Sequence, residues 1–397
     1  MHRFSTPWGD LDLTRFPADP REPLRAWDAA DDYLVRYLVE PGEGTGPVDM
    51  SGAVVVVGDR WGALATALAA RAGGSPSGPV VTQITDSYLG QQATLANLRR
   101  NAAPGAAGAP VRLISTQDAP PERIDVLLIR VPKSLALLED QLHRLAPAVH
   151  AGTVVVGTGM VTEIHTSTLR LFERILGRTN TSLAVRKARL IFCTPDLRLS
   201  RTPGPWPLRY ALPDGIGPLS GRTVTSHAGV FCADRLDIGT RLLLRHLPVR
   251  HGPDRVVDLG CGNGVVGTAA ALANPASDVL FVDESYQAVA SAEATFRANA
   301  DPGTKAEFAV ADALSAIPAA SADLVLNNPP FHSHRATTDT TARRMFATAR
   351  TALRTGGELW VVGNRHLGYH LRLRRLFGAC DVVASDPKFV ILRAVKR

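Results

Sequence analysis

The chain has 397 residues, of which 45% are hydrophobic and 20% charged, and this suits two globular domains of roughly 150–200 residues each. Its formal net charge of +7 favours a polyanionic partner only slightly, because a composition rich in Ala, Arg and Gly produces such a charge without functional demand. The four cysteines form no C-x-x-C pair, the N-terminus lacks the pattern of a signal peptide, and no apolar run approaches the length of a membrane span. We therefore expect a protein of the reducing cytoplasm without metal site, disulfide or membrane segment.

Short apolar runs in the N-terminal half predict buried β-strands. They are Val54–Val57, which precedes Gly58, then Ile124–Leu128, and Val154–Val156, which follows Gly152. Helix-compatible stretches lie between most of the runs, and Asn101 closes one of these helices. This alternation is typical of a parallel α/β sheet that is buried on both faces.

The middle of the chain is rich in proline and glycine. The residues 202–207 and 212–215 contain most of them, and such a stretch sustains neither a helix nor a central strand. We place a linker at 195–220, between a domain at 1–194 and a domain at 221–397.

The C-terminal half repeats the pattern of the N-terminal half. Its apolar runs are Val256–Leu259, Val279–Val282, Leu324–Leu326 and Leu359–Val362. Corresponding features of the two halves keep their order at a near-constant shift of roughly 200 residues, which chance similarity would not produce. In this comparison Asp86 takes the place of Asp283. The predicted fold is α/β, with two tandem Rossmann-like domains.

A glycine-rich turn follows the first strand of the C-terminal half. Asp258 is followed by Gly260, Gly262 and Gly264, and a small-residue helix is expected at Val265–Ala273. Glycines permit positive φ and let the backbone approach a ligand, which the free amides at the helix start then face. The turn predicts a cofactor site.

Two cofactor classes use such a turn. Gly262 and Gly264, with Gly267, satisfy the dinucleotide fingerprint, whereas Asp-x-Gly-x-Gly-x-Gly is the commoner form in S-adenosylmethionine enzymes. In either class Asp283 would accept hydrogen bonds from the ribose hydroxyls. Asp312, after the predicted strand Phe308–Ala311, is placed to reach the adenine amino group.

The sequence Asn327-Asn328-Pro329-Pro330-Phe331-His332 follows the third predicted strand, at the edge where open α/β sheets bind ligands. The Asn328 side-chain oxygen and the Pro329 carbonyl can accept both N–H bonds of a planar amine and so turn its lone pair towards a sulfonium methyl group. Pro330 stiffens the loop with Pro329, and Phe331 offers a face for stacking an extruded base. His332 could relay the released proton or only hold the loop, and no metal is required. A dehydrogenase has no use for this loop, so S-adenosylmethionine becomes the predicted cofactor.

The N-terminal half lacks this chemistry. It reads Gly58-Asp59-Arg60-Trp61-Gly62 at the glycine turn, where Trp61 would intrude on a cofactor, and Arg130-Val131-Pro132-Lys133 at the catalytic loop. We predict a degenerate methyltransferase domain that supports the active one and helps to hold RNA. Its candidate phosphate contacts are Arg99, Arg100, Lys133, Arg186, Lys187 and Arg189.

The chain resembles the bacterial ribosomal RNA guanine-N2 methyltransferases (the RsmC/RlmG type). The glycine turn carries the resemblance together with His227–Phe231, Leu236–Gly239, Val282–Ser285, Asn328–His332 and Gly363–Leu367. Four N-terminal stretches are similar to the branch of the family that acts on 23S rRNA, namely Leu13–Pro17, Ala26–Asp31, Val131–Lys133 and His165–Leu169. The resemblance implies N2-methylguanine as product, a degenerate N-terminal domain, and Phe231, Asp237 and Gly239 as residues that help to close the cofactor site.

Four alternatives remain open at this stage. The enzyme could methylate a guanine N2 of 16S rRNA, or another amine such as adenine N6 or a protein glutamine, since the Asn-Pro-Pro-aromatic loop serves all of these. The chain could be a non-catalytic RNA-binding assembly factor, or a nicotinamide-dependent oxidoreductase. We expect a cytoplasmic monomer that binds rRNA, 23S rRNA in the favoured interpretation.

Overall fold

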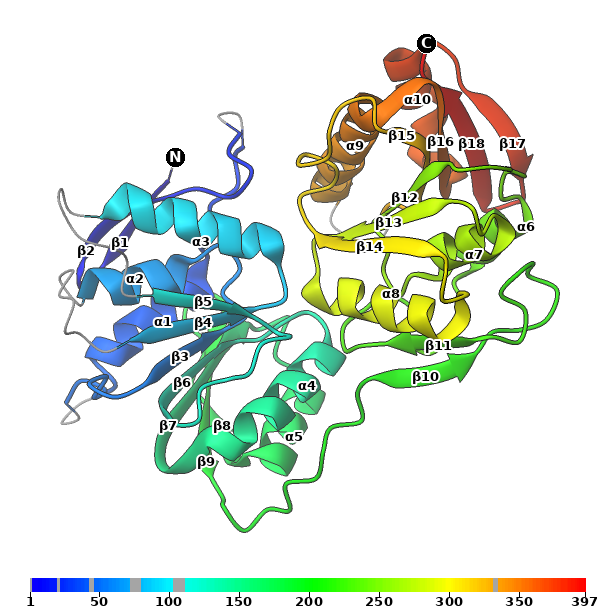
Figure 1. The fold of residues 1–397 in the computed structure, drawn as a ribbon. Helices are drawn as coiled ribbons and strands as arrows, with labels where there is room; N and C mark the ends of the chain where they lie inside the picture. The colour runs from blue at the N-terminus through cyan, green and yellow to red at the C-terminus, as the bar shows by residue number, and fades with distance from the viewer. Residues whose placement is uncertain (1, 20–21, 43–45, 72–79, 103–110, 331–334) are drawn as a thin grey trace. The chain divides into compact units, whose positions relative to one another are not determined.

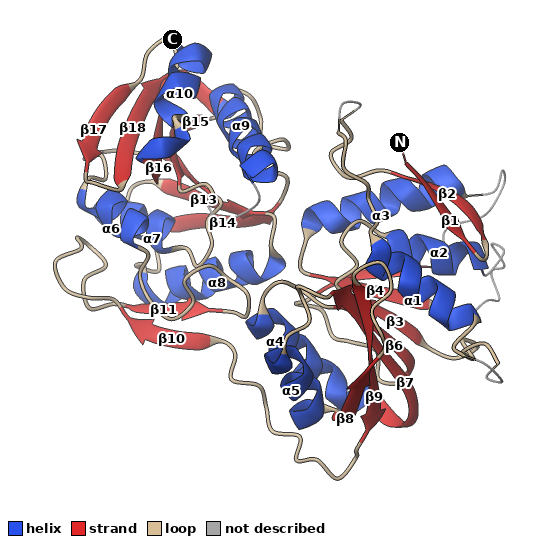
Figure 2. Cartoon of the chain, turned by 180° about the vertical axis from the view of Figure 1, so that it is seen from behind, coloured by secondary structure: helices blue, strands red, loops and turns tan. Residues whose placement is uncertain are grey.

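The structure is a computed structural model, and it describes residues 2–19, 22–42, 46–71, 80–102, 111–330 and 335–397. The chain divides into two compact units, Met1–Pro205 and Trp206–Arg397 (Figure 1). Each unit is an α/β domain with helices against a central sheet (Figure 2).

The N-terminal unit is built on one seven-stranded sheet and one hairpin. Its elements are β1 (His2–Thr6), β2 (Gly9–Leu13), α1 (Ala29–Val39), β3 (Val54–Val57), α2 (Ala63–Arg71), β4 (Val81–Thr85), α3 (Tyr88–Asn101), β5 (Val111–Ser115), β6 (Ile124–Arg130), α4 (Leu135–Leu145), β7 (Val149–Met160), α5 (Thr166–Ile175), β8 (Gly177–Thr181) and β9 (Ala188–Pro195). The sheet has the order β5-β4-β3-β6-β7-β9-β8, and β1 and β2 form the hairpin.

The C-terminal unit repeats this plan. Its elements are β10 (Leu208–Ala211), β11 (Thr223–Ser226), α6 (Ile238–Arg245), β12 (Arg255–Leu259), α7 (Val265–Ala273), β13 (Asp278–Asp283), α8 (Tyr286–Asn299), β14 (Lys305–Val310), β15 (Ala322–Asn327), α9 (Arg335–Ala352), β16 (Leu353–Asn364), α10 (Tyr369–Phe377), β17 (Asp381–Ser385) and β18 (Phe389–Val395). The sheet order β14-β13-β12-β15-β16-β18-β17 matches that of the N-terminal unit strand for strand. The prediction of two tandem Rossmann-like domains is confirmed.

The last strands of each sheet differ from the parallel sheet that the sequence predicted. β18 pairs antiparallel with both β16 and β17, and β9 does the same with β7 and β8. Only three residues, 386–388, join β17 to β18, and such a short connection forms a hairpin, since a parallel pair needs a crossover of a dozen or more residues.

The strand registers correct one pairing of the two halves. Val57 pairs with Ile84 in the N-terminal sheet, and Leu259 pairs with Val282 in the C-terminal sheet. The residue after Ile84 is Thr85, so Thr85 and not Asp86 stands where the C-terminal sheet has Asp283. The sequence comparison was wrong by one residue here, because an apolar run alone does not fix strand register.

The segment 195–220, predicted as a linker, contains β10 near its middle. β10 pairs antiparallel with β11, from Leu208 opposite Ser226 to Ala211 opposite Thr223. The prolines lie before and after this short strand, so they leave its backbone free to pair.

Among the described residues, no helix has the length and hydropathy to cross a membrane.

Candidate active site

Three adjacent strands of the C-terminal sheet bring the predicted site residues to one edge. Leu259, at the end of β12, pairs with Val282 on one side and with Asn327 on the other. All three strands are parallel, so Asp283, which ends β13, lies at the same edge of the sheet as the glycine turn and Asn328, which follow β12 and β15. The strand order reverses direction at β12, and such a switch point is where open α/β sheets bind ligands.

The glycine turn has the backbone that the sequence predicted. Gly260, Gly262 and Gly264 have φ of +72°, +53° and +76°, a region that side chains with a Cβ rarely adopt. A Cβ on Gly264 would also lie 2.6 Å from the backbone Cα of Ala292 in α8. The turn therefore requires glycine at this position for two independent reasons.

Asp258 lies beneath the turn. Its Oδ2 accepts a hydrogen bond of 2.7 Å from the backbone N–H of Gly267, in the first turn of α7, and only 2% of the residue is exposed. Burial raises the pKa of this carboxyl to about 8, although the Gly267 hydrogen bond opposes the rise. This geometry ties the strand to the helix and so fixes the turn between them.

Asp283 bridges the glycine turn and the start of α8. Its Oδ2 accepts from the N–H of Gly262 at 3.0 Å, and its Oδ1 accepts from the N–H of Ser285 at 3.1 Å. Burial raises the pKa of Asp283, and the backbone amides oppose the rise. A carboxylate offers about four acceptor positions, so these bonds leave capacity for a ribose hydroxyl.

Asp312 is engaged with a cation. Its Oδ1 lies 2.8 Å from Nε of Arg344 in α9, and 10% of the Asp312 side chain is exposed. Burial raises the pKa of this carboxyl while Arg344 opposes the rise. The strand before it, β14, ends at Val310, so Asp312 lies in the loop beyond the sheet. Any contact between Asp312 and an adenine amino group would share the carboxylate with Arg344.

The two asparagines at the end of β15 point to opposite faces of the sheet. Asn327 donates from Nδ2 to the carbonyl oxygen of Leu259 at 2.6 Å, which ties the Asn-Pro-Pro loop to the strand before the glycine turn. Asn328 donates from Nδ2 to Oγ1 of Thr240 in α6 at 2.9 Å. The Oδ1 atom of Asn328 is buried and has no hydrogen-bond partner among the described residues. A buried acceptor in this state costs about 1–3 kcal/mol, which a donor from a ligand would recover.

Pro329 is buried and Pro330 is exposed, so the first proline anchors the loop and the second faces solvent. Phe331 and His332, the predicted stacking residue and the candidate proton relay, lie outside the described residues. Among the residues that the structure describes, no group of three or more His, Cys, Asp and Glu side chains could hold a metal ion.

The N-terminal unit keeps the shape of the glycine turn but fills the equivalent edge with charge. Gly58 and Gly62 have φ of +72° and +79°, as Gly260 and Gly264 do. By strand register Arg130 stands where the other unit has Asn328. Its guanidinium is 1% exposed and forms ion pairs with three acidic side chains, Asp28 at 2.7 Å, Glu163 at 2.8 Å and Asp31 at 3.5 Å.

Arg60, in the glycine turn, completes the network through ion pairs with Glu163 at 2.5 Å and Asp28 at 3.5 Å. Burial would raise the pKa of Glu163, but its two arginines outweigh burial and lower that pKa to about 2. Trp61 packs against the hydrophobic core with Arg15 over its ring. The buried ion network, more than Trp61, therefore occupies the edge where the C-terminal unit places its site.

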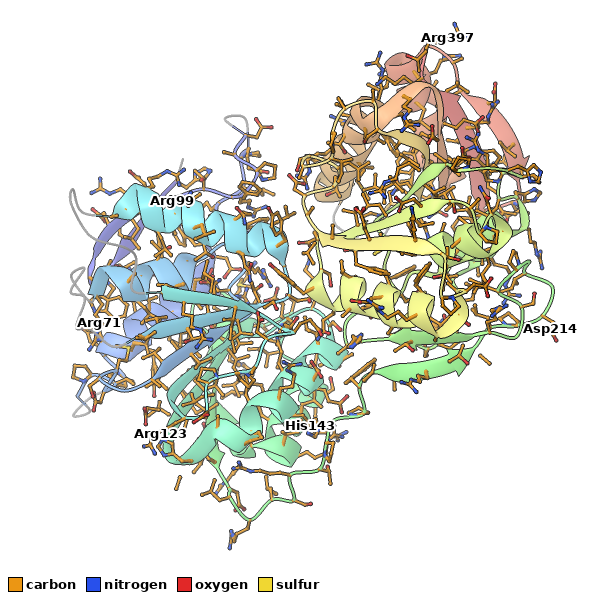
Figure 3. All side chains as sticks on the ribbon, in the orientation of Figure 1. Arg71, Arg99, Arg123, His143, Asp214 and Arg397 are labelled. Atoms are coloured by element: carbon orange, nitrogen blue, oxygen red, sulfur yellow. The ribbon has the colours of Figure 1, made fainter. Side chains whose placement is uncertain are left out.

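The candidate phosphate contacts of the N-terminal unit are not equivalent. Arg99, in the last turn of α3, is exposed (Figure 3), as are Lys133 and Lys187. Arg100 donates to Asn97, and Arg186 pairs with Asp32 at 3.2 Å. Arg100 and Arg186 are exposed as well but are already engaged by side chains of this unit, and Arg189 is half-buried.

Comparisons with known proteins agree with this geometry. Family models match residues 1–197, as the RLMG N-terminal domain, and residues 221–393, as the methyltransferase small domain. Proteins named ribosomal RNA large subunit methyltransferase G are similar over the full length: that of Streptomyces griseus is 68% identical over 397 residues, covering 100% of both chains. That of Streptomyces avermitilis is 70% identical over 393 residues, covering 99% of both, and that of Pseudomonas aeruginosa strain PAO1 is 46% identical over 396 residues, covering 100% of both.

The chain belongs to the ribosomal RNA large subunit methyltransferase G family. It is an S-adenosylmethionine-dependent methyltransferase, so S-adenosylmethionine and not a nicotinamide dinucleotide is its cofactor. Among solved structures, the Thermus thermophilus 16S rRNA N2 G1207 methyltransferase, in complex with AdoMet and guanosine, matches with a TM-score of 0.73. The match covers 100% of this chain and 98% of that chain at 21% identity, and it shows the fold alone.

Two polar residues at this edge were assigned no role from the sequence. Thr240 holds the amide of Asn328, and its position three residues after Asp237 is a helix-start pattern that could have drawn attention to it. Asn364, at the end of β16, has a buried Oδ1 without a partner among the described residues. It lies within the stretch Gly363–Leu367 that carries the family resemblance, but the sequence assigned it no role, because only the pairing of β16 with β15 brings it to the site edge.

Proposed function

We propose that this enzyme transfers the methyl group of S-adenosylmethionine to the exocyclic N2 of a specific guanine in 23S rRNA. The observation that carries the proposal is the buried Oδ1 of Asn328, an acceptor without a partner among the described residues at the switch point of the sheet. A planar amine supplies the N–H that this acceptor lacks. The names of the full-length relatives support a large-subunit rRNA as the substrate.

The chemistry asks the chain to orient a weak nucleophile. The lone pair of guanine N2 is delocalised into the ring, and Asn328 Oδ1 together with the Pro329 carbonyl would accept its two N–H bonds and hold it in line with the methyl group. A bond forms between N2 and the methyl carbon while the bond between sulfur and that carbon breaks. The electron pair stays on sulfur, giving S-adenosylhomocysteine, and N2 releases one proton to water.

The cofactor supplies an activated methyl group when bound, and the residues of the turn fit it. We propose that the backbone of Gly260, Gly262 and Gly264 lies along its methionine end and that Asp283 accepts from its ribose. Asp258 acts beneath the turn by holding α7. Asp312, shared with Arg344, is the candidate acceptor for the adenine amino group.

A concentration of positive charge supports an RNA substrate. Residues 340–380 contain eight arginines and one acidic residue, Glu358, so this segment alone has a formal charge of +7, as large as that of the whole chain. Six of the eight arginines are exposed, and they lie on α9, on α10, at the start of β16 and directly after its end. Arg365 follows β16 directly, at the same sheet edge as Asn328. Phosphates neutralised there would help to hold the RNA at the site.

Further parts of the proposal rest on the sequence. We propose Phe331 as the stacking platform for the extruded guanine, His332 as a loop residue or proton relay, and the N-terminal domain as a catalytically inactive support that contacts RNA. We also propose a monomeric state, a cytoplasmic location, and two domains that extend beyond the limits 1–194 and 221–397, since the compact units are Met1–Pro205 and Trp206–Arg397.

The test is methyl transfer from radiolabelled S-adenosylmethionine to rRNA by the purified full-length chain. Asn328→Ala should lower the single-turnover rate by about 10²–10³-fold, the cost of removing one positioned hydrogen-bonding group from a transition state. Binding of S-adenosylhomocysteine, measured by calorimetry, should stay near that of the wild type. An Asn328→Ala variant that transfers methyl groups at the wild-type rate would contradict the assignment.

A further inference from the structure

Thr240 connects the start of α6 to the catalytic loop. Its Oγ1 accepts the Nδ2–H of Asn328 at 2.9 Å and donates to Oδ2 of Asp237 at 3.3 Å. The same Asp237 oxygen accepts from the backbone N–H of Thr240 at 2.9 Å and caps the helix. Three side chains therefore form one line of hydrogen bonds from the helix cap to the site.

The direction of this line follows from the chemistry of its first member. An ionised carboxylate only accepts hydrogen bonds, so the single hydroxyl proton of Thr240 is committed to Asp237. The lone pairs of Oγ1 are then the groups that remain for Asn328. Only the Nδ2 side of the Asn328 amide can donate to them, and the opposite flip would set two acceptors against each other.

This arrangement determines which atom of Asn328 faces away from α6. With Nδ2 held on Thr240, Oδ1 points elsewhere, and it is the buried atom without a partner among the described residues. An amine substrate brings N–H donors, which require an acceptor and would be repelled by Nδ2. The flip state of one amide thus decides whether the site can hold its substrate.

Packing keeps the start of α6 in place. Gly239, between Asp237 and Thr240, lies so close to the sheet that a Cβ there would be 3.1 Å from Cε1 of Phe389 in β18. Thr240 itself is 8% exposed, so water competes little for its hydroxyl. The hydrogen bonds are therefore fixed before the substrate arrives, which is how positioning lowers a barrier.

We propose that Thr240, oriented by Asp237, is a positioning residue that sets the Asn328 amide with its oxygen towards the reacting amine. Thr240 touches neither cofactor nor substrate in this role and acts only through Asn328. The inference rests on the proposed function, because it assumes that Asn328 holds the amine.

The test replaces the Thr240 hydroxyl while keeping its shape. Thr240→Val should lower the single-turnover rate of methyl transfer to 23S rRNA by about 10- to 100-fold, with the affinity for S-adenosylhomocysteine within about twofold of wild type. Thr240→Ser restores the hydroxyl and should transfer within about threefold of wild type. Should Thr240→Val fail to fold, Thr240→Ala takes its place under the same criteria.

Thr268→Val in α7 is the matched control. Thr268 is also a buried threonine, but its hydroxyl has no hydrogen-bond partner among the described residues. The same substitution there should leave the rate near that of wild type. A loss that equals that of Thr240→Val would mean that the loss comes from packing, and it would overturn the proposal.

The double variant Thr240→Val/Asn328→Ala separates positioning from a general structural role. If Thr240 acts through Asn328, the double variant should transfer at the rate of Asn328→Ala alone. An independent additional loss, or a wild-type rate for Thr240→Val, would overturn the proposal. A wild-type chain that does not methylate 23S rRNA would instead refute the proposed function, so the two failures are distinguishable.

Discussion

The buried ion network around Arg130 should contribute a measurable part of the free energy of unfolding of the N-terminal unit. Arg130→Met removes a guanidinium that is 1% exposed and pairs with three carboxylates at 2.7–3.5 Å. Breaking a buried pair from one side typically costs about 3–5 kcal/mol, because the partner charges stay behind. We expect the lower end, about 3 kcal/mol, since Asp28 is 33% exposed and Arg60 still pairs with Asp28 and Glu163.

Native-state hydrogen exchange, read by mass spectrometry on the buried amides of β6, measures this cost for the N-terminal unit alone. Arg36→Met is the control, because Arg36 is 55% exposed and forms an i,i+4 pair with Asp32, so it should cost under about 1 kcal/mol. Equal losses for the two variants would refute the idea that the network stabilises this unit.

The stability that this network gives to the N-terminal unit should depend on pH. The folded pKa of Glu163 is about 2, below its ordinary value of 4.5, so its contribution is present above pH 4.5 and lost as pH falls towards 2. The difference in free energy of unfolding between the wild type and Arg130→Met should therefore shrink as the pH falls from 4.5 to 2. A difference that stays constant down to pH 2 would contradict the assigned ion pairs.

Three predictions concern the C-terminal unit. Asp283→Asn should weaken binding of S-adenosylhomocysteine by about 10- to 100-fold in calorimetry, the value of about 1.5–3 kcal/mol for a hydrogen bond to a charged group. Asp258 has a folded pKa of about 8, above its ordinary value of 3.8, so the wild type should lose stability relative to Asp258→Asn as pH rises from 4 to 8 in urea unfolding. The double variant Arg374→Gln/Arg375→Gln should bind rRNA more weakly, with a salt slope that is smaller by about 1 for each phosphate that is no longer neutralised.

Each of these has a control and a contradicting result. The control for Asp283→Asn is Glu293→Gln on α8, where Glu293 pairs with Arg297, and it should leave the binding of S-adenosylhomocysteine unchanged. If Asp283→Asn also left this binding unchanged, the assignment of Asp283 to the ribose would be contradicted. If the free energies of unfolding of the wild type and of Asp258→Asn changed with pH in parallel, that result would contradict the raised pKa of the Asp258 carboxyl. Arg297→Gln should keep the wild-type salt slope, and a slope unaltered by the α10 changes would place the RNA elsewhere.

The sequence predicted the sheets because strands buried on both faces are continuous apolar runs that end at recognisable turns. Val256–Leu259 was expected and β12 is Arg255–Leu259, and the helix Val265–Ala273 was expected at the bounds that the structure gives it. The repeat was visible because both halves keep the same order of runs. The antiparallel hairpin of β17 and β18 was missed, since apolar runs carry no strand direction.

The site was predictable only where the chemistry is local in sequence. The glycine turn and the Asn-Pro-Pro loop are contiguous motifs. The bond from Asn328 to Thr240, the pair of Asp312 with Arg344, and the network around Arg130 join residues far apart in the chain. Partners of this kind become visible only when the fold brings the strands and helices together.

The central claim is methylation of guanine N2 in 23S rRNA, and mass spectrometry of rRNA from a strain that lacks this gene tests it most directly. The account predicts that 23S rRNA loses one N2-methylguanine, that the wild-type gene restores it, and that the gene encoding Asn328→Ala does not. An unchanged 23S rRNA, or a loss from 16S rRNA instead, would contradict it.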